Sequence, residues 1–284
     1  MKNIAEIGII GGSGLYDMEQ LSKKREVKVK TPFGSPSDAI MLGEIKGVKC
    51  AFLPRHGKRH TLLPSEIPQK ANMWALKSLG AKKIISVSAV GSLKKSLAPT
   101  HFVFPDQFVD ETKGRTSTFF GGGIVGHVPM AKPFCEEISK IMFGVARKIG
   151  IKSHFGGIYV CMEGPQFSTK AESKYHRQMG YSVIGMTMAT EAKLAREAGF
   201  CYSPVSLVTD YDCWLEGEEV DQEKVTQTLR KNVENIKKLL LKTVPLIAGA
   251  GCSSNCADFI KSSVLTAKSA IKKNMYNKLK IFLE

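Results

Sequence analysis

The sequence is best interpreted outward from one stretch, Val205-Ser206-Leu207-Val208-Thr209-Asp210-Tyr211-Asp212-Cys213-Trp214. It begins as an apolar run, which is typical of a buried strand, and it then reaches two carboxylates, Asp210 and Asp212. Carboxylates are rare at the end of a buried strand unless they are paired, hydrogen-bonded or functional. The stretch therefore predicts either an Asx-type turn after a strand or a functional site at the strand end.

Other predicted strands also run into small or polar residues. A glycine-rich turn lets backbone N–H groups approach an anion closely, and an arginine offers a planar fork of donors that suits phosphate oxygens. The glycine turn fits neither a dinucleotide fingerprint nor a P-loop. These strand ends are Gly11-Gly12-Ser13-Gly14, Pro54-Arg55-His56-Gly57, Ser88-Ala89-Val90-Gly91-Ser92, Glu163-Gly164-Pro165-Gln166-Phe167 and Gly185-Met186-Thr187.

Apolar residues at helical spacing alternate with these strands. They predict helices over residues 68–79, 134–149, 169–179 and 190–198, and a last one capped by Asp221. The expected buried stripe of that last helix is Val225, Leu229, Ile236, Leu239 and Leu240. The alternation predicts a single-domain α/β fold, a mostly parallel central sheet with helices on both faces. Because ligands bind beyond the carboxyl ends of such strands, the polar strand ends converge on one site.

Composition narrows the class of protein. An apolar content of 43% and a charged content of 24% over 284 residues are ordinary for a globular chain. No window is apolar enough for a membrane helix, and the N-terminus lacks a signal-peptide pattern, so we expect a cytoplasmic protein that does not contact membranes. The net charge of +15 makes nucleic-acid binding a candidate function. However, the lysines are scattered and no recognition module is present. We therefore expect small anionic ligands and no nucleic acid.

The cysteines and the C-terminal segment form a separate question. Seven cysteines without dense clustering indicate reduced thiols. Cys252 and Cys256 have neither CxxC spacing nor evident partners elsewhere for zinc, so no metal site is predicted, and a local disulfide between them stays open. We expect residues 1–246 to form the catalytic domain and residues 247–284 a linker and a basic helical tail, either packed or solvated, with a membrane-surface helix as the alternative.

With these motifs assembled, residues 5–245 resemble the trimeric branch of the purine nucleoside phosphorylase family, and within it the members that act on 5′-methylthioadenosine. The motifs are I-I-G-G-S-G-L, T-P-F-G-S-P-S-D, P-R-H-G, S-A-V-G-S-L, H-V-P-M-A-K-P-F-C, E-G-P-Q-F-S-T-K-A-E and T-D-Y-D-C-W. The resemblance implies a phosphorylase/hydrolase-like fold, a role in methionine and purine salvage, and assembly as a homotrimer or a dimer of trimers. It also implies inorganic phosphate as co-substrate, with no cofactor and no metal.

The implied reaction is phosphorolysis, in which phosphate displaces adenine and leaves 5-methylthioribose 1-phosphate. By matching position, the residues implied to hold phosphate are Ser13, Arg55, His56, Thr187 and the backbone of Ala89. Those implied to contact the nucleoside are Val90, Gly91, Phe167 on the base, Met186 on the ribose, and Val225 and His127 at the 5′ end, His127 reaching a neighbouring subunit's site. The residues implied to be catalytic are Asp210 and Asp212, which address N7 and the 6-amino group.

This chemistry suits the residues independently. Breaking an N-glycosidic bond builds positive charge on the ribose, which a phosphate dianion stabilises, and negative charge on the purine, which a carboxyl group of raised pKa can protonate. In an extended strand end, Asp210 and Asp212 would point to the same side, so one would stay protonated. We expect Asp212 to be the proton donor and Asp210 to accept from the 6-amino group, with the exchanged assignment as the alternative.

Two alternatives remain. Gly185 replaces the asparagine of animal members, and members that prefer methylthioinosine can have Gly-Met-Thr here, so a 6-oxopurine nucleoside or methylthioinosine phosphorylase is one alternative. Those members lack the T-D-Y-D motif, which favours adenine for this chain. A phosphate-independent nucleosidase is the other, and Arg55, His56 and Thr187 argue against it.

Overall fold

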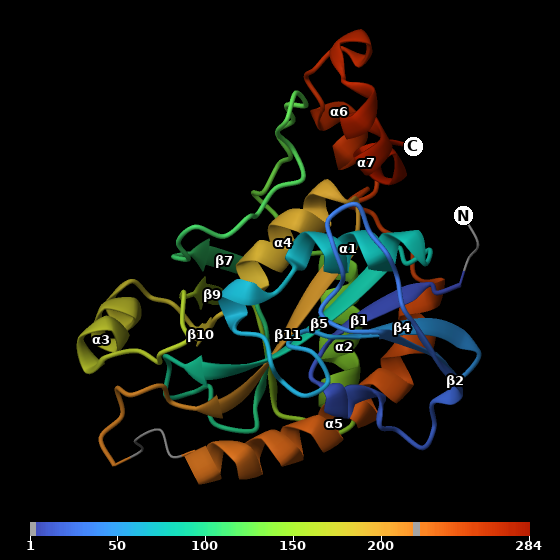
Figure 1. Ribbon diagram of the computed structural model, residues 1–284. Helices are drawn as coiled ribbons and strands as arrows, with labels where there is room; N and C mark the ends of the chain where they lie inside the picture. Colours follow the sequence, from blue (N-terminus) through green and yellow to red (C-terminus); the bar gives the residue numbers. More distant parts are fainter. Residues whose placement is uncertain (1–3, 218–221) are drawn as a thin grey trace.

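The computed structural model describes residues 4–217 and 222–284, apart from the side chains of Ser13, Tyr16 and Gln222 (Figure 1). Its strands form one mixed, mostly parallel sheet, which confirms the predicted fold class. At the centre, β4 (Val48–Pro54), β1 (Ile7–Gly11), β5 (Lys83–Ser92) and β11 (Cys201–Asp210) lie parallel in that order. They are nearly continuous apolar runs because both faces of the sheet are covered.

Shorter strands extend this centre on both sides. On one side β3 (Ile40–Ile45) pairs antiparallel with β4, and β2 (Ser22–Val27) pairs antiparallel with β3. The remaining strands are β6 (Phe102–Phe104), β7 (Gln107–Asp110), β8 (Ser153–Phe155), β9 (Ile158–Cys161) and β10 (Val183–Gly185). The apolar pattern did not predict β2, β3, β7 and β8. β2 is charged and exposed along almost its whole length, so it lacks the apolar pattern that marks a strand.

Helices cover both faces, as expected. α1 (Gln69–Ser78) and α4 (Met188–Glu197) pack on one face, and α2 (Glu136–Lys148) and α5 (Gln222–Gly249) pack on the other (Figure 1). α3 (Lys170–Gln178) lies at the edge, and its N-cap Thr169 forms a capping box with Glu172. Each face therefore has its own hydrophobic core.

The stripe predicted for α5 is only partly buried. Ile236, Leu239 and Leu240 are fully buried, whereas Leu229 is 37% exposed and Val225 is half-buried, so placing these two in the core was wrong. In the first turns of the helix Leu229 lines a cavity at the strand ends instead of the core, which explains its exposure. The predicted cap Asp221 lies outside the described residues.

The C-terminal segment packs against the body of the protein. Instead of one helix it forms α6 (Phe259–Ser263), a 3-10 turn and α7 (Lys273–Leu283), and residue 247 still lies within α5. Trp74 Nε1 donates to the Lys278 carbonyl at 3.1 Å, and Phe282 packs on Phe119 with ring centroids 4.5 Å apart. No helix among the described residues is long and apolar enough to cross a membrane.

Truncation of Phe282 tests how firmly the tail is packed. Phe282 is 5% exposed, so Phe282→Ala should leave a cavity and lower the free energy of unfolding by about 3 kcal/mol, measured by urea denaturation. Leu265→Ala is the control, because Leu265 is 66% exposed in the same tail and its loss should change stability by less than about 0.5 kcal/mol. Equal stabilities for the two variants would show that the tail adds nothing to the core.

Candidate active site

The carboxyl ends of β1, β4 and β5 meet beside α5 and enclose a cavity of about 260 Å³. His56 and Ala89, both predicted phosphate-binding residues, line this cavity. Ser13 begins the 3-10 turn between lining residues Gly12 and Leu15, but its side chain is outside the described part of the chain. Leu229 and Val233 of α5 form the apolar wall. The sequence did not indicate either residue as part of the site. Helical spacing favoured a core position for Leu229, and Val233 lay outside the predicted stripe.

Arg55 is buried at 3% exposure and is held by the protein's own acceptors. Its Nε and Nη2 donate to the carboxylate of Glu191 in α4, Nη1 donates to the Val87 carbonyl at 2.8 Å, and Nη2 also donates to Ser86 Oγ at 2.8 Å. Glu191 further accepts from Ser86 and from the hydroxyl of Tyr202. The guanidinium fork is therefore already engaged, and direct contact of Arg55 with phosphate stays a prediction.

His56 is a neutral imidazole at the wall of the cavity. Its Nδ1 lies 2.8 Å from the Leu62 carbonyl, and its ring stacks on His60 with centroids 4.5 Å apart. Burial, helped by the charge of Arg55, lowers the pKa of His56 to about 4. Because a carbonyl can only accept, Nδ1 carries the hydrogen and Nε2 is left as an acceptor. The ring is suited to accept a hydrogen bond from a protonated phosphate oxygen.

Thr187 and Met186 lie in the turn between β10 and α4. Thr187 is buried and is the N-cap of α4, but its side chain makes no cap hydrogen bond, so the hydroxyl is available beside the first N–H groups of the helix. Arg115 holds this turn: it donates to the Met186 carbonyl and to Glu163, with Nε 3.0 Å from Oε1. Arg115 thus positions the loops after β9 and β10 together, a role that local pattern could not reveal.

Asp210 and Asp212 are joined by a turn, not by extended strand. The ladder with β5 is irregular between Val208 and Asp210, and Asp210 Oδ1 accepts from the Asp212 N–H at 2.8 Å, which is an Asx turn. Asp212 has φ +54°, so the expectation that an extended strand end directs both side chains to one side was wrong. A Cβ on Gly91 would lie 3.1 Å from Asp210 Oδ1 and 3.4 Å from Asp212 Cβ. The carboxylate of Asp210 and the Cβ of Asp212 therefore pack against the end of β5.

The two carboxyl groups differ in their partners. Asp210 accepts from the Thr209 hydroxyl at 2.7 Å and from the Asp212 backbone, whereas Asp212 Oδ2 is buried with no hydrogen-bond partner among the described residues. Burial raises the pKa of both groups, and the charge of Asp212 adds to the effect on Asp210. The hydroxyls of Ser173 and Ser168 face the Asp212 carboxyl group and lower its pKa, against the larger effect of burial. Because both carboxyl groups have a raised pKa, either can stay protonated, and the choice of Asp212 as proton donor stays a prediction.

The other residues that were predicted to contact the nucleoside do not gather at the cavity. Phe167 is 68% exposed, Val90 is buried, and Val225 is half-buried without lining the cavity. His127 is exposed on the segment 111–134, green in Figure 1, which rises beside α6 and α7 and away from the end of β11. The backbone N–H of His127 donates to the Ser263 carbonyl at 2.9 Å. Within one chain the structure does not bring His127 to the two aspartates.

The packing around position 185 leaves no room for a side chain. A Cβ at this position would stand 1.9 Å from the hydroxyl oxygen of Tyr159, which is buried in β9. The hydroxyl faces the Thr187 N–H without forming a well-oriented hydrogen bond, and burial raises the pKa of Tyr159 far above its ordinary value. Tyr159 therefore occupies the space that a side chain at position 185 would need.

Comparison with known proteins places these features in a family. Residues 6–245 match the model of the phosphorylase superfamily. The chain is 49% identical over 280 residues to an S-methyl-5′-thioadenosine phosphorylase of Koribacter versatilis, covering 98% of this chain and 96% of the relative. A crystal structure of a methylthioadenosine phosphorylase from an antarctic soil metagenomic library superposes with a TM-score of 0.95 at 47% identity, covering both chains fully. The Schistosoma mansoni methylthioadenosine phosphorylase with adenine gives 0.86 at 38% identity, covering 92% and 99%.

The contact between Gly185 and Tyr159 can be measured as a coupling. Gly185→Ala should destabilise the protein by about 1–3 kcal/mol, because the new methyl group overlaps the hydroxyl and neither neighbour is free to move far. In the Tyr159→Phe background the same substitution should cost less, and a double-mutant cycle of unfolding free energies gives the difference. An identical cost in both backgrounds would mean that the hydroxyl does not exclude a side chain at position 185.

Proposed function

The chain belongs to the phosphorylase superfamily, and we propose that it is an S-methyl-5′-thioadenosine phosphorylase, a pentosyltransferase that uses inorganic phosphate. Phosphate attacks C1′ of methylthioadenosine, the N-glycosidic bond breaks, and adenine and 5-methylthioribose 1-phosphate leave. The observation that carries this proposal is the pair of aspartates at the end of β11, which pack on Gly91 of β5, two residues beyond the cavity-lining Ala89.

The proposed phosphate-binding half of the site consists of uncharged hydrogen-bond donors. The Ala89 backbone and the glycine turn before η1 (Ser13–Tyr16) border the cavity, and Thr187 lies at the N-terminus of α4. Arg55 lies beneath this region with its charge balanced by Glu191, so its first role is to hold β4, β5 and α4 in place. Backbone N–H groups and hydroxyls so held bind an anion without reorganising.

The purine half is supported by the difference between the two aspartates. Protonated Asp212 donates to N7 as negative charge develops on the leaving base. Ionised Asp210, already an acceptor for Thr209, accepts from the 6-amino group, which a 6-oxo purine lacks. The packing of Tyr159 gives Gly185 a structural role that does not depend on the base.

The 5′ end and the assembly extend the proposal. Leu229 and Val233 give the cavity an apolar wall on α5, and Val225 lies one turn before Leu229, which suits a methylthio group. Since His127 is exposed on a segment that rises away from the end of β11, we place it at the 5′ end of a neighbouring chain's site in a homotrimer or a dimer of trimers. We further propose that the enzyme works in the cytoplasm in methionine and purine salvage; its seven free cysteines suit a reducing compartment.

The first test is the dependence on phosphate. Release of adenine from methylthioadenosine should require phosphate or arsenate. Thr187→Ala should raise the KM for phosphate, with a loss in kcat/KM worth about 1.5–3 kcal/mol, the value of a hydrogen bond to a charged group. Thr190→Ala is the matched control, since Thr190 is buried on the same helix and its hydroxyl has no partner among the described residues. Fast cleavage in phosphate-free buffer would instead identify a nucleosidase.

The second test separates the two carboxyl groups. Asp212→Asn should lower kcat/KM for every substrate by about 10²–10⁴, because it removes the general acid, and it should abolish the loss of activity that wild type shows as pH rises through the raised pKa of Asp212. Asp210→Asn should mainly improve methylthioinosine relative to methylthioadenosine. If neither variant changes rate or base preference, the aspartates form only a structural Asx turn.

A further inference from the structure

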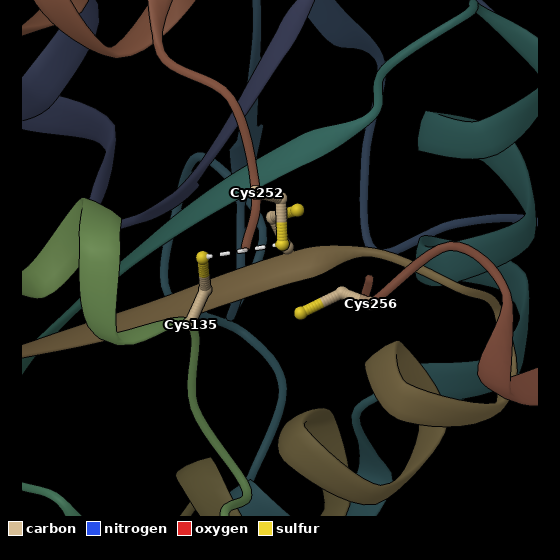
Figure 2. A group of neighbouring side chains, drawn as sticks. Cys135, Cys252 and Cys256 are labelled. Carbon is tan, nitrogen blue, oxygen red and sulfur yellow. Dashed lines mark hydrogen bonds between the residues drawn. The ribbon is translucent and has the colours of Figure 1, made fainter. Parts of the chain in front are cut away.

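Four cysteines from three parts of the sequence meet at the opposite end of β11 from the aspartates. Cys135 is the N-cap of α2, Cys201 is the first residue of β11, and Cys252 and Cys256 lie between α5 and α6. Their four Sγ atoms all lie within 4.8 Å of one another, and those of Cys135 and Cys252 are 4.0 Å apart (Figure 2). The expectation that Cys252 and Cys256 have no partners was therefore wrong.

The spacing suits a metal ion better than a covalent bond. Four thiolates around Zn²⁺ at about 2.3 Å lie on a tetrahedron whose edges are about 3.8 Å. A disulfide needs its sulfur atoms at about 2.05 Å, and all seven cysteines of the chain are free. We propose that Cys135, Cys201, Cys252 and Cys256 bind one Zn²⁺ ion in a closed, structural site.

Burial and donor chemistry support this proposal. Cys135, Cys201 and Cys256 are at most 7% exposed, and Figure 2 shows the labelled side chains directed toward a common centre. Four soft sulfur ligands select a thiophilic ion, and a complete tetrahedral set leaves no open position for a substrate. The site is therefore separate from the catalytic cavity.

A buried cation faces the cluster. A zinc ion with four thiolates carries a net charge of −2, which needs compensation in a buried place. Arg196 of α4 is 4% exposed, its Nη1 lies 4.0 Å from Cys256 Sγ, and its Nε has no hydrogen-bond partner among the described residues. Its guanidinium also lies 4.6 Å from the centroid of Phe259, the first residue of α6.

A carboxylate holds the loop that brings two of the ligands. Glu137 in the first turn of α2 accepts from the Ser253 backbone at 3.1 Å and also from the Ser253 hydroxyl. It lies 3.4 Å from Cys135 Sγ as well, a contact that a thiol can make and a thiolate cannot. On metal binding the proton of Cys135 leaves to solvent and Glu137 keeps its bonds to Ser253, so the loop stays attached to α2.

The consequence concerns the C-terminal segment. The ion would join the 252–256 loop to α2 and β11, so residues 250–284 would be tied to the central sheet and not only packed on it. Because ligand binding to the folded state adds to its stability, removing the ion should loosen this tail first.

Metal content is the direct test. Full-length protein is produced with zinc in the medium and purified without chelators, and zinc is measured by mass spectrometry after gel filtration. Wild type should keep about one zinc per chain, the expectation for a single four-cysteine site. Cys252→Ser/Cys256→Ser should lose it, while Cys50→Ala, which alters a buried cysteine of β4 outside the cluster, should retain it.

A second measurement on wild type alone removes any dependence on how the variants fold. Metal-free protein titrated with Co²⁺ should show the charge-transfer and d–d absorption of a tetrahedral thiolate site, and Zn²⁺ should displace it. Chelation should also make residues 250–258 more sensitive to protease. Fully alkylatable thiols that bind neither ion would overturn the proposal. So would a mass lower by the hydrogens of one or two disulfides, which would identify the cluster as a redox pair.

Discussion

The ion pair between Arg55 and Glu191 is the interaction on which the site depends. A buried guanidinium and a fully buried carboxylate are tolerated only together, and removing either would leave an uncompensated charge in the core. Their remaining bonds reach Ser86 and Val87 of β5 and Tyr202 of β11. The pair therefore fixes the position of α4 relative to three parallel strands, and with it the distance between the Thr187 turn and the end of β4.

The long ladder of backbone pairs between β5 and β11 positions the two aspartates at the end of β11. The pairing runs from Cys201 and Lys83 to Asp210 and Gly91, where it becomes irregular and the chain turns through the positive φ of Asp212. One end of β11 thus presents the two carboxyl groups, and its first residue contributes a thiol to the four-cysteine cluster. Catalytic precision and attachment of the C-terminal segment depend on the same strand, which is buried along its whole length up to Asp210.

Ion pairing and burial set the charges of the titratable groups in the site. Glu191 neutralises Arg55, burial keeps His56 uncharged near neutral pH, and burial raises the pKa of both aspartates. Under the proposed function, an anionic co-substrate would enter a cavity that is lined by the glycine turn, Ala89 and the neutral ring of His56. The phosphate itself would then stabilise the oxocarbenium charge that develops on the ribose.

Local pattern in the sequence determined the fold class, most of the helices and the central strands, because hydrophobic periodicity depends on neighbours within a few residues. It also predicted polar groups at the strand ends, of which His56 and Ala89 line one cavity. Tertiary structure alone decided what those residues contact. Glu191 is 136 positions from Arg55, Tyr159 fills the space above Gly185, and Cys252 meets Cys135 across 117 positions. No local pattern encodes such pairs, since they form only when parallel crossovers bring distant strands and helices to the same edge of the sheet.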